Sequence, residues 1–200
     1  MAFTYFFRDL PILELVTQHV VPYVSGRSRV TVWDAGCAMG PEPYTLAILF
    51  AEAMGKFAFK NLRIVATDLD ASFGAVIRAG VYADEEIARV PDEIRRKYFR
   101  KAERPGSCEV APEIRERVTF IHHDLLTLAP VGQGLSLIVC KNVLLHFQPG
   151  ERVEVLRMFH GALAPGGYFA SEQTQKMPTE VGHLFAQVTG DGQLHRKVGE

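Results

Sequence analysis

The chain has 200 residues, of which 48% are hydrophobic and 22% charged, so it suits one folded domain and is not disordered. Its 22 basic and 23 acidic residues give a net charge of −1, which argues against a nucleic-acid binder. Three separated cysteines without a Cys-x-x-Cys pair indicate reduced thiols, with no metal site. No signal-peptide pattern or membrane-length apolar run is present, so we expect a cytoplasmic protein without membrane insertion.

Helices and strands alternate through the N-terminal part of the chain. In chain order we expect a helix over 10–23, a strand over 30–33, a helix over 42–54, a strand over 62–67 and a helix over 71–79. Asp9 is placed to cap the first helix, with Pro11 in its first turn. This order predicts an α/β protein with a parallel sheet and right-handed crossovers.

Residues 84–117 differ from the rest, because they hold nine acidic and nine basic residues and few large apolar ones. We expect them to form a small subdomain inserted within a single domain that spans 1–200. Inside this region, 92–100 is predicted to be a short charged helix and 108–110 a small strand.

The sheet is expected to resume after this region. The predicted elements are strands over 118–121 and 135–140, a helix over 149–163, a strand over 168–171, and a hairpin with strands over 184–188 and 194–198. The helix is expected to stop at the Ala-Pro-Gly-Gly sequence of 164–167. A Gly-Asp-Gly sequence at 190–192 is expected to turn the hairpin.

The most informative local pattern is a strand that ends in Asp34, followed by a loop with Gly36 and Gly40 before the next helix. Glycines there let a ligand approach the backbone closely, and the helix N-terminus favours negative charge. A dinucleotide fingerprint requires a second close glycine where Ala38 stands, and the Gly-Lys-Ser/Thr ending of a P-loop is missing. The loop alone leaves a dinucleotide, a nucleotide and S-adenosylmethionine open.

Asp68, at the end of the second strand, narrows this choice. An acid at this place accepts hydrogen bonds from both ribose hydroxyls, and a two-hydroxyl sugar without a pyrophosphate fits S-adenosylmethionine. The alternative interpretation of Asp68 is a helix N-cap. For Asp34, direct contact with the ligand and a carboxylate that braces the loop both stay open.

Five segments in series carry a resemblance to a known family. They are Thr-Tyr-Phe-Phe-Arg at 4–8, Trp-Asp-Ala-Gly-Cys-Ala-Met-Gly-Pro-Glu-Pro-Tyr at 33–44, Ala-Thr-Asp-Leu-Asp at 66–70, Cys-Lys-Asn-Val-Leu-Leu-His-Phe at 140–147 and Leu-Ala-Pro-Gly-Gly-Tyr at 163–168. In this order, over residues 3–172, the chain resembles the CheR family, the chemotaxis-receptor glutamate methyltransferases. The resemblance implies a doubly wound, Rossmann-like class I methyltransferase sheet with an antiparallel final strand and a small inserted subdomain. It also implies S-adenosylmethionine as methyl donor and S-adenosylhomocysteine as product.

The resemblance and the glycine loop together give a set of candidate site residues. The expected cofactor-binding residues are Thr4, Arg8, Gly36, Glu42, Asp68, Asp124, Leu125, Asn142 and Val143, and the expected catalytic residues are Arg8 and His146. Glu42 keeps one of two adjacent glutamates of the family motif, and Pro41 replaces the other. The planar guanidinium of Arg8 suits an acceptor carboxylate, and the alternative is a surface ion pair with a nearby acid.

The expected reaction needs no general base, because a glutamate side chain with an ordinary pKa near 4.3 is already an anion at pH 7. We therefore expect an in-line displacement in which the protein positions the reactants. His146 departs from the family, which commonly has a tyrosine at this position beside the reacting methyl. An imidazole also accepts a proton near neutral pH, which suits an amine or hydroxyl acceptor. The alternative is a histidine that only packs at a loop.

The expected partner is a protein substrate, namely a chemoreceptor-like helical domain. The sequence begins almost at the Thr-x-Phe-Phe-Arg motif and does not contain the family's N-terminal helical domain, which contributes to receptor recognition. Two alternatives therefore stay open. One is a methyltransferase for an amine, a hydroxyl or a small carboxylic acid, and the other is an inactive module that binds S-adenosylmethionine.

Overall fold

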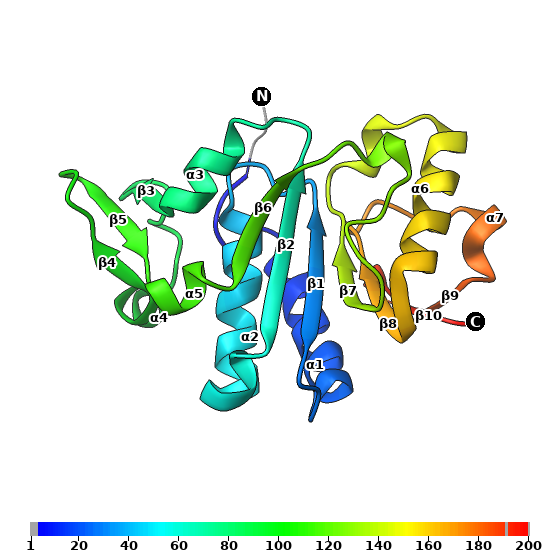
Figure 1. Ribbon diagram of the computed structural model, residues 1–200, viewed down its shortest axis with the longest axis horizontal. Coiled ribbons are helices and arrows are strands. Elements are labelled where there is room, and N and C mark those ends of the chain that lie inside the picture. The colour runs from blue at the N-terminus through cyan, green and yellow to red at the C-terminus, as the bar shows by residue number, and fades with distance from the viewer. Residues whose placement is uncertain (1–3, 191, 200) are drawn as a thin grey trace.

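The computed structural model describes residues 4–190 and 192–199, and its centre is a seven-stranded sheet with the order β6-β2-β1-β7-β8-β10-β9 (Figure 1). The strands are β1 (Val30–Ala35), β2 (Leu62–Asp68), β6 (Val118–His122), β7 (Leu135–Val139), β8 (Leu163–Ala170), β9 (Phe185–Gln187) and β10 (Leu194–Lys197). Strands β6, β2, β1, β7 and β8 run parallel, whereas β10 is antiparallel to both of its neighbours. The predicted doubly wound sheet with an antiparallel final strand is confirmed.

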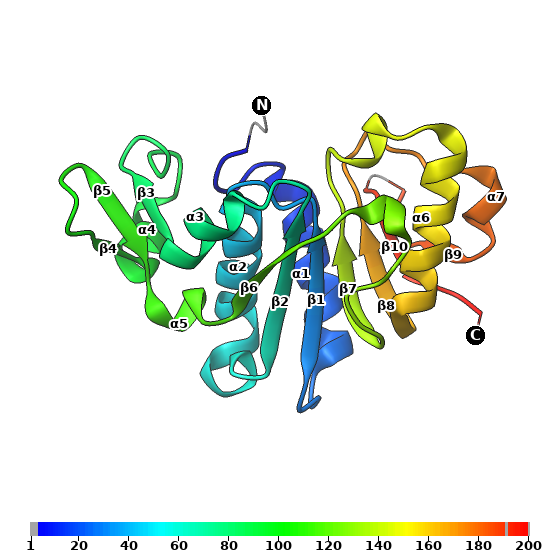
Figure 2. The same cartoon turned by 45° about the horizontal axis from the view of Figure 1, so that its top comes forward.

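Helices cover both faces of this sheet. They are α1 (Leu10–Val24), α2 (Pro41–Phe59), α3 (Phe73–Ala79), α6 (Pro149–Ala162) and α7 (Thr179–Gly182), with the short 3-10 turns η1 (Leu125–Thr127) and η2 (Leu144–His146). Helices α1 and α2 lie behind the sheet, and α6 lies in front of β7 and β8 (Figures 1 and 2). Trp33 in β1 is fully buried, and its ring meets Phe159 of α6 edge to face at 5.1 Å. Among the described residues, no helix has the length and apolarity needed to cross a membrane.

Three local expectations are wrong in detail. Asp9 stands at the N-cap of α1, but its backbone is left-handed (φ 54°) and its carboxylate makes no capping hydrogen bond. Helix α6 ends at Ala162 and β8 starts at once, so residues 164–167 belong to a strand with an irregular register against β7. The charged helix predicted over 92–100 is shorter, because α4 (Asp92–Tyr98) gives way to a strand at Phe99.

A second, three-stranded sheet stands beside the main one. Its strands are β3 (Val81–Ala83), β5 (Ser107–Val110) and β4 (Phe99–Lys101), in the order β3-β5-β4, with α4 and α5 (Pro112–Arg115) around them. All its pairings are antiparallel. Tyr82 connects it to the loop between β1 and α2, because its hydroxyl donates to the carbonyl oxygen of Met39 at 2.8 Å. We propose that this small sheet forms the body of the inserted subdomain.

Candidate active site

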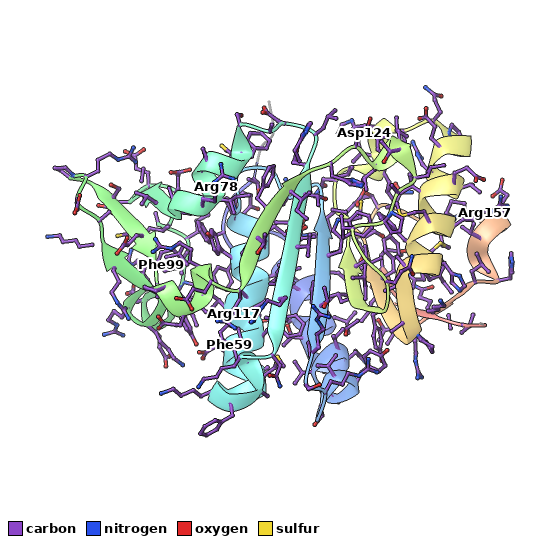
Figure 3. The ribbon with its side chains drawn as sticks, viewed as in Figure 1. Phe59, Arg78, Phe99, Arg117, Asp124 and Arg157 are labelled. Atoms are coloured by element: carbon purple, nitrogen blue, oxygen red, sulfur yellow. The ribbon has the colours of Figure 1, made fainter. Side chains whose placement is uncertain are left out.

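A cavity of about 630 Å³ opens at the edge of the main sheet where the parallel strands end. Asp124 marks this edge, and Phe59 lies at the opposite edge (Figure 3). The cavity brings together all the residues that the sequence singled out, which are Thr4, Arg8, Gly36, Glu42, Asp68, Asp124, Leu125, Asn142, Val143 and His146. They meet there because the carboxyl ends of parallel strands share one edge of the sheet. Their roles toward a ligand stay predictions.

The loop after β1 is shaped by backbone contacts. The N–H groups of Gly36 and Cys37 donate to the carbonyl oxygen of Thr67 at 2.8 and 2.9 Å, which holds the loop against β2. Gly36 has a left-handed backbone (φ 98°), and a Cβ there would overlap Cγ2 of Val143. The site therefore requires glycine at this position, both for the backbone angle and for the close approach of Val143.

Asp68 faces the same cavity from the end of β2. Its Oδ2 accepts the N–H of Ala38 at 2.9 Å, and its Oδ1 accepts the N–H of Asp70 at 3.1 Å. Helix α3 begins only at Phe73, so the alternative that Asp68 caps a helix is wrong. Each carboxylate oxygen keeps a further lone pair for a ligand hydroxyl.

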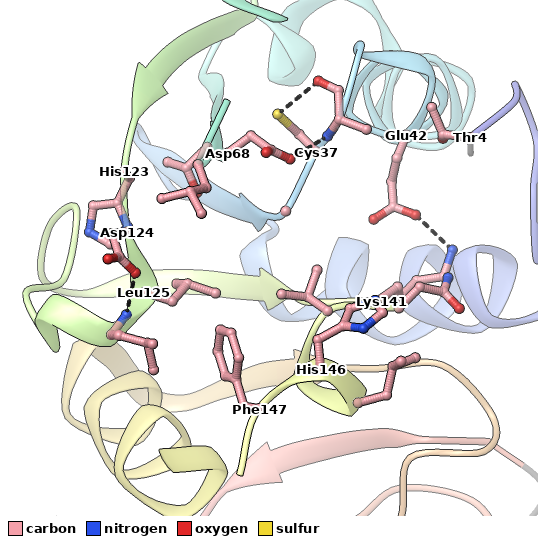
Figure 4. A pocket seen from close by; sticks show the side chains of 18 of the residues that line it. Thr4, Cys37, Glu42, Asp68, His123, Asp124, Leu125, Lys141, His146 and Phe147 are labelled. Atoms are coloured by element: carbon pink, nitrogen blue, oxygen red, sulfur yellow. Dashed lines mark hydrogen bonds and ion pairs between the residues drawn. The ribbon is translucent and has the colours of Figure 1, made fainter. Parts of the chain in front are cut away.

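Asp124 and Leu125 form the adjoining wall. The Oδ1 of Asp124 accepts the N–H of Leu126 at 2.9 Å and so caps η1, while the Leu125 side chain is 7% exposed. Asp68 and Asp124 lie on one side of the cavity, with Glu42 and Lys141 on the other (Figure 4). Carboxylates therefore stand at both ends of the cavity with apolar surface between them.

The loop after β7 supplies the third wall. Asn142 has a left-handed backbone (φ 59°), and its N–H donates to Oε2 of the buried Glu172 at 2.9 Å. Val143 follows and packs over Gly36. His146 ends η2 with its side chain exposed at the cavity, so the structure places it as a lining residue and does not bury it as a packing residue.

Lys141 is the residue of the site that sequence reasoning missed. Its side chain is fully buried, and its Nζ lies 2.8 Å from Oε2 of Glu42 and 3.3 Å from Oδ2 of Asp9. Burial alone would lower the pKa of this ammonium, but the charges of Glu42 and Asp9 raise it above its usual value. The sequence does hold a signal for this residue, because a lysine that comes directly after Cys140, at the end of a wholly buried strand, must be paired with acidic side chains.

The positions of Arg8 and Asp34 bear on the two roles that the sequence left open for each of them. The Nε of Arg8 lies 3.7 Å from Oδ2 of Asp9, so the alternative ion pair is present, yet Arg8 also lines the cavity. Asp34 is fully buried and does not line the cavity, so the alternative of direct ligand contact is wrong. Its carboxyl faces that of Glu42 in the first turn of α2, and the alternative of a carboxylate that braces the loop stays a prediction. Burial, and then the charge of Glu42, raise the pKa of this carboxyl well above its ordinary value.

The residues present fit S-adenosylmethionine. Gly36 and Val143 pack together in the wall of the cavity, Asp68 offers acceptors to a ribose, and Glu42 offers a carboxylate to an ammonium group. No group of three or more His, Cys, Asp and Glu side chains in the described part of the chain is placed to hold a metal ion.

Comparison with known proteins identifies the family. Residues 2–192 match the family described as "CheR methyltransferase, SAM binding domain". The chain is 36% identical over 191 residues to chemotaxis protein methyltransferase 1 of Pseudomonas aeruginosa, covering 88% of this chain and 67% of that protein. A probable chemotaxis protein methyltransferase of Rhizobium etli is 28% identical over 192 residues, covering 93% of this chain and 72% of that protein.

A third relative shows the same region within a much longer chain. An uncharacterized 104.1 kDa protein of Rhodobacter capsulatus is 35% identical over 170 residues, which are 82% of this chain and 18% of that protein. The chain thus spans less than a fifth of this relative and about two thirds to three quarters of the two methyltransferases.

Solved structures support the fold. A methyltransferase from Geobacter sulfurreducens matches with a TM-score of 0.51 at 13% identity, covering 92% of this chain and 79% of that one. PKMT2 from Rickettsia typhi, in complex with AdoHcy, matches with a TM-score of 0.50 at 16% identity, covering 86% and 26%. The fold is that of class I methyltransferases. From the family match over most of its length and the Pseudomonas relative, the chain belongs to the CheR methyltransferase family, and its cofactor is S-adenosylmethionine.

Proposed function

We propose that the chain transfers the methyl group of S-adenosylmethionine to glutamate side-chain carboxylates of a protein in the cytoplasm, a chemoreceptor or a receptor-like helical partner. One observation carries the proposal. A single cavity is lined by Asp68 on one side and by Glu42 on the other, and Arg8 lines the same cavity. This set provides for a ribose, an ammonium group and an acceptor carboxylate, and the names of the Pseudomonas and Rhizobium relatives agree with the reaction.

The residues of the cavity act by positioning. When bound, S-adenosylmethionine supplies a methyl group that its positively charged sulfur has already activated. Asp68 and Glu42 hold the two ends of the donor, and the guanidinium of Arg8 orients the acceptor carboxylate. Because that carboxylate is already ionised, no residue has to remove a proton. Alignment of this kind lowers a barrier by up to about 7–11 kcal/mol.

The direct test uses methyl-labelled S-adenosylmethionine and the cytoplasmic helical domains of candidate receptors. We expect methyl esters on glutamates, recognised because mild base releases the label. Asp68→Ala removes the ribose contact and abolishes labelling, whereas Asp70→Ala is the matched control, because Asp70 holds only the turn at Ser72. Base-stable labelling, or none with any receptor domain, would refute the proposal.

The exposed side chain of His146 at the cavity supports a second candidate, transfer to an amine or a hydroxyl. Such an acceptor needs a group that takes a proton, which an imidazole provides and a phenol at neutral pH does not. His146→Tyr separates the two candidates. A glutamate methyltransferase keeps its activity in this variant, whereas an enzyme that uses His146 as a base loses it.

A further inference from the structure

We propose that Lys141 is a positioning residue whose buried ammonium latches the N-terminal strap (residues 4–9) onto Glu42. The strap carries Thr4 and Arg8 to the rim of the cavity, and Glu42 lies beside it at the start of α2. In this arrangement Lys141 itself does not hold the cofactor. This role of Lys141 rests on the proposed function in one respect, namely that Glu42 and the strap face the cofactor.

The first support is the number of acceptors around the ammonium. The Nζ of Lys141 donates to Oε2 of Glu42 at 2.8 Å and to the carbonyl oxygen of Arg8 at 3.5 Å, and it lies 3.3 Å from Oδ2 of Asp9. An ammonium has three N–H donors, so each has an acceptor within this chain. Lys141 is thereby committed to the protein, and its ammonium holds the Glu42 carboxylate that lines the cavity.

The second support is electrostatic. The side chain of Lys141 is fully buried, that of Glu42 is 12% exposed and that of Asp9 is 41% exposed. A buried ammonium is stable only when paired, and here two carboxylates from different segments pair with it. Removing the ammonium leaves Glu42 with a shielded, unpaired charge and releases the end of the strap.

The third support is the backbone of the strap. Phe7 and Asp9 are both left-handed, at φ 61° and 54°, which non-glycine residues adopt only when surrounding contacts hold them. The middle of the strap is anchored by the ring of Phe6 against Tyr82 at 5.0 Å and by the N–H of Phe7, which donates to Oγ1 of Thr45 at 3.0 Å. The contacts of Lys141 hold the other end, beside Arg8.

The test begins on the strap side, with Asp9→Asn. Asparagine tolerates the left-handed backbone, so the change removes the charge and leaves the conformation in place. We expect S-adenosylhomocysteine to bind about threefold to tenfold more weakly by calorimetry, which is the range for a half-exposed ion pair. Amide hydrogen exchange over residues 4–9 should become faster. Glu14→Gln, an exposed acid on α1, is the matched control for loss of one negative charge and should change neither measurement.

Lys141→Met removes the ammonium and keeps the length of the side chain, and Lys141→Arg keeps the charge. We expect S-adenosylhomocysteine to bind about a hundredfold more weakly to Lys141→Met and less than tenfold more weakly to Lys141→Arg. Methylthioadenosine, which lacks the amino-acid end, should bind all variants as it binds the wild type. A general collapse of the cavity would weaken the binding of both ligands, whereas a role through Glu42 weakens the binding of S-adenosylhomocysteine alone.

The outcomes separate this proposal from the proposed function. If wild-type protein binds S-adenosylhomocysteine and Asp9→Asn binds it within twofold with unchanged exchange, the latch is refuted and the function is untouched. The latch is also refuted if the Lys141→Arg and Asp9→Asn variants lose as much affinity for methylthioadenosine as they lose for S-adenosylhomocysteine. Failure to form methyl esters with every receptor domain refutes the proposed acceptor, while the binding measurements still decide the latch because they need no acceptor.

Discussion

Replacement of Asp68 by alanine is the sharpest test of the cofactor site, because this side chain has contacts that can be counted. Its two oxygens accept the N–H groups of Ala38 and Asp70 at 2.9 and 3.1 Å. The same oxygens face the cavity, where two ribose hydroxyls of the cofactor are proposed to donate. Alanine removes all four contacts, two within the protein and two toward the ligand.

The two sets of contacts predict two different magnitudes. Hydrogen bonds to a charged group are worth about 1.5–3 kcal/mol each, so losing two ribose contacts should weaken binding by about 3–6 kcal/mol, or more than a hundredfold. The hydrogen bond from Asp70 is exposed, whereas the one from the buried Ala38 is partly buried, so their loss should cost about 1–3 kcal/mol of stability. For a domain of this size each kcal/mol lowers the Tm by about 2–4 °C.

Calorimetry with S-adenosylhomocysteine and a thermal melt measure these quantities on one protein sample. Asp70→Ala should bind almost as the wild type does, because the carboxylate of Asp70 accepts hydrogen bonds from Ser72 and its backbone N–H, which donates to Asp68, is kept. NAD should bind neither protein measurably. Binding by Asp68→Ala within threefold of the wild type would show that the ribose does not lie at Asp68 and would refute the assignment of this end of the cavity.

Three further predictions concern the walls of the cavity. Gly36→Ala should lose cofactor binding and about 2–4 kcal/mol of stability in a urea melt, because its Cβ overlaps Val143 and its φ is 98°; a variant that melts and binds normally contradicts this. Glu172→Ala leaves the N–H of Asn142 unpaired, which should cost about 1–3 kcal/mol and weaken binding, measured by the same two methods, with Glu180→Ala as an exposed control. Asp34 has a pKa raised above its ordinary 3.8 by burial and then by Glu42, so the folded state binds this proton more tightly than the unfolded state, and the contribution of this carboxyl to stability falls as pH rises above 3.8. Asp34→Asn should therefore gain stability over the wild type as pH increases from 5 to 8, and a constant difference across that range would show that Asp34 does not titrate there.

The parts of the site that the sequence predicts correctly are those that depend on strand ends. Asp68 ends a strand and Gly36 and Asn142 follow strands, and parallel topology brings such positions to one edge whatever the register of the side chains. The strands themselves were predictable because they are short, buried and rich in β-branched residues. Residues at the ends of the predicted strands are therefore enough to place the cavity, although the sequence contains no distances.

The parts that were missed depend on contacts between distant segments. Asp9 carries the usual signs of a helix cap, but its carboxylate is drawn to Lys141, which lies 132 positions away in the chain. The strand β8 takes in Pro165 and Gly166, which locally favour a turn, because β7 and β10 pair with the residues around them. Local propensity is overridden wherever a buried charge or a neighbouring strand offers more than the local partner does.

The cofactor side and the acceptor side of the cavity are built differently, and this difference bears on specificity. Toward the cofactor, Asp68, Glu42 and Asn142 are held by hydrogen bonds or an ion pair with the chain itself. At the mouth stand side chains that are largely solvent-exposed, among them Leu145 at 45% exposure and His146. Preorganised groups fix one ligand, whereas exposed apolar groups gain most when a large partner covers them. The exposed side chains at the mouth therefore support the proposed protein acceptor, which would cover them on binding.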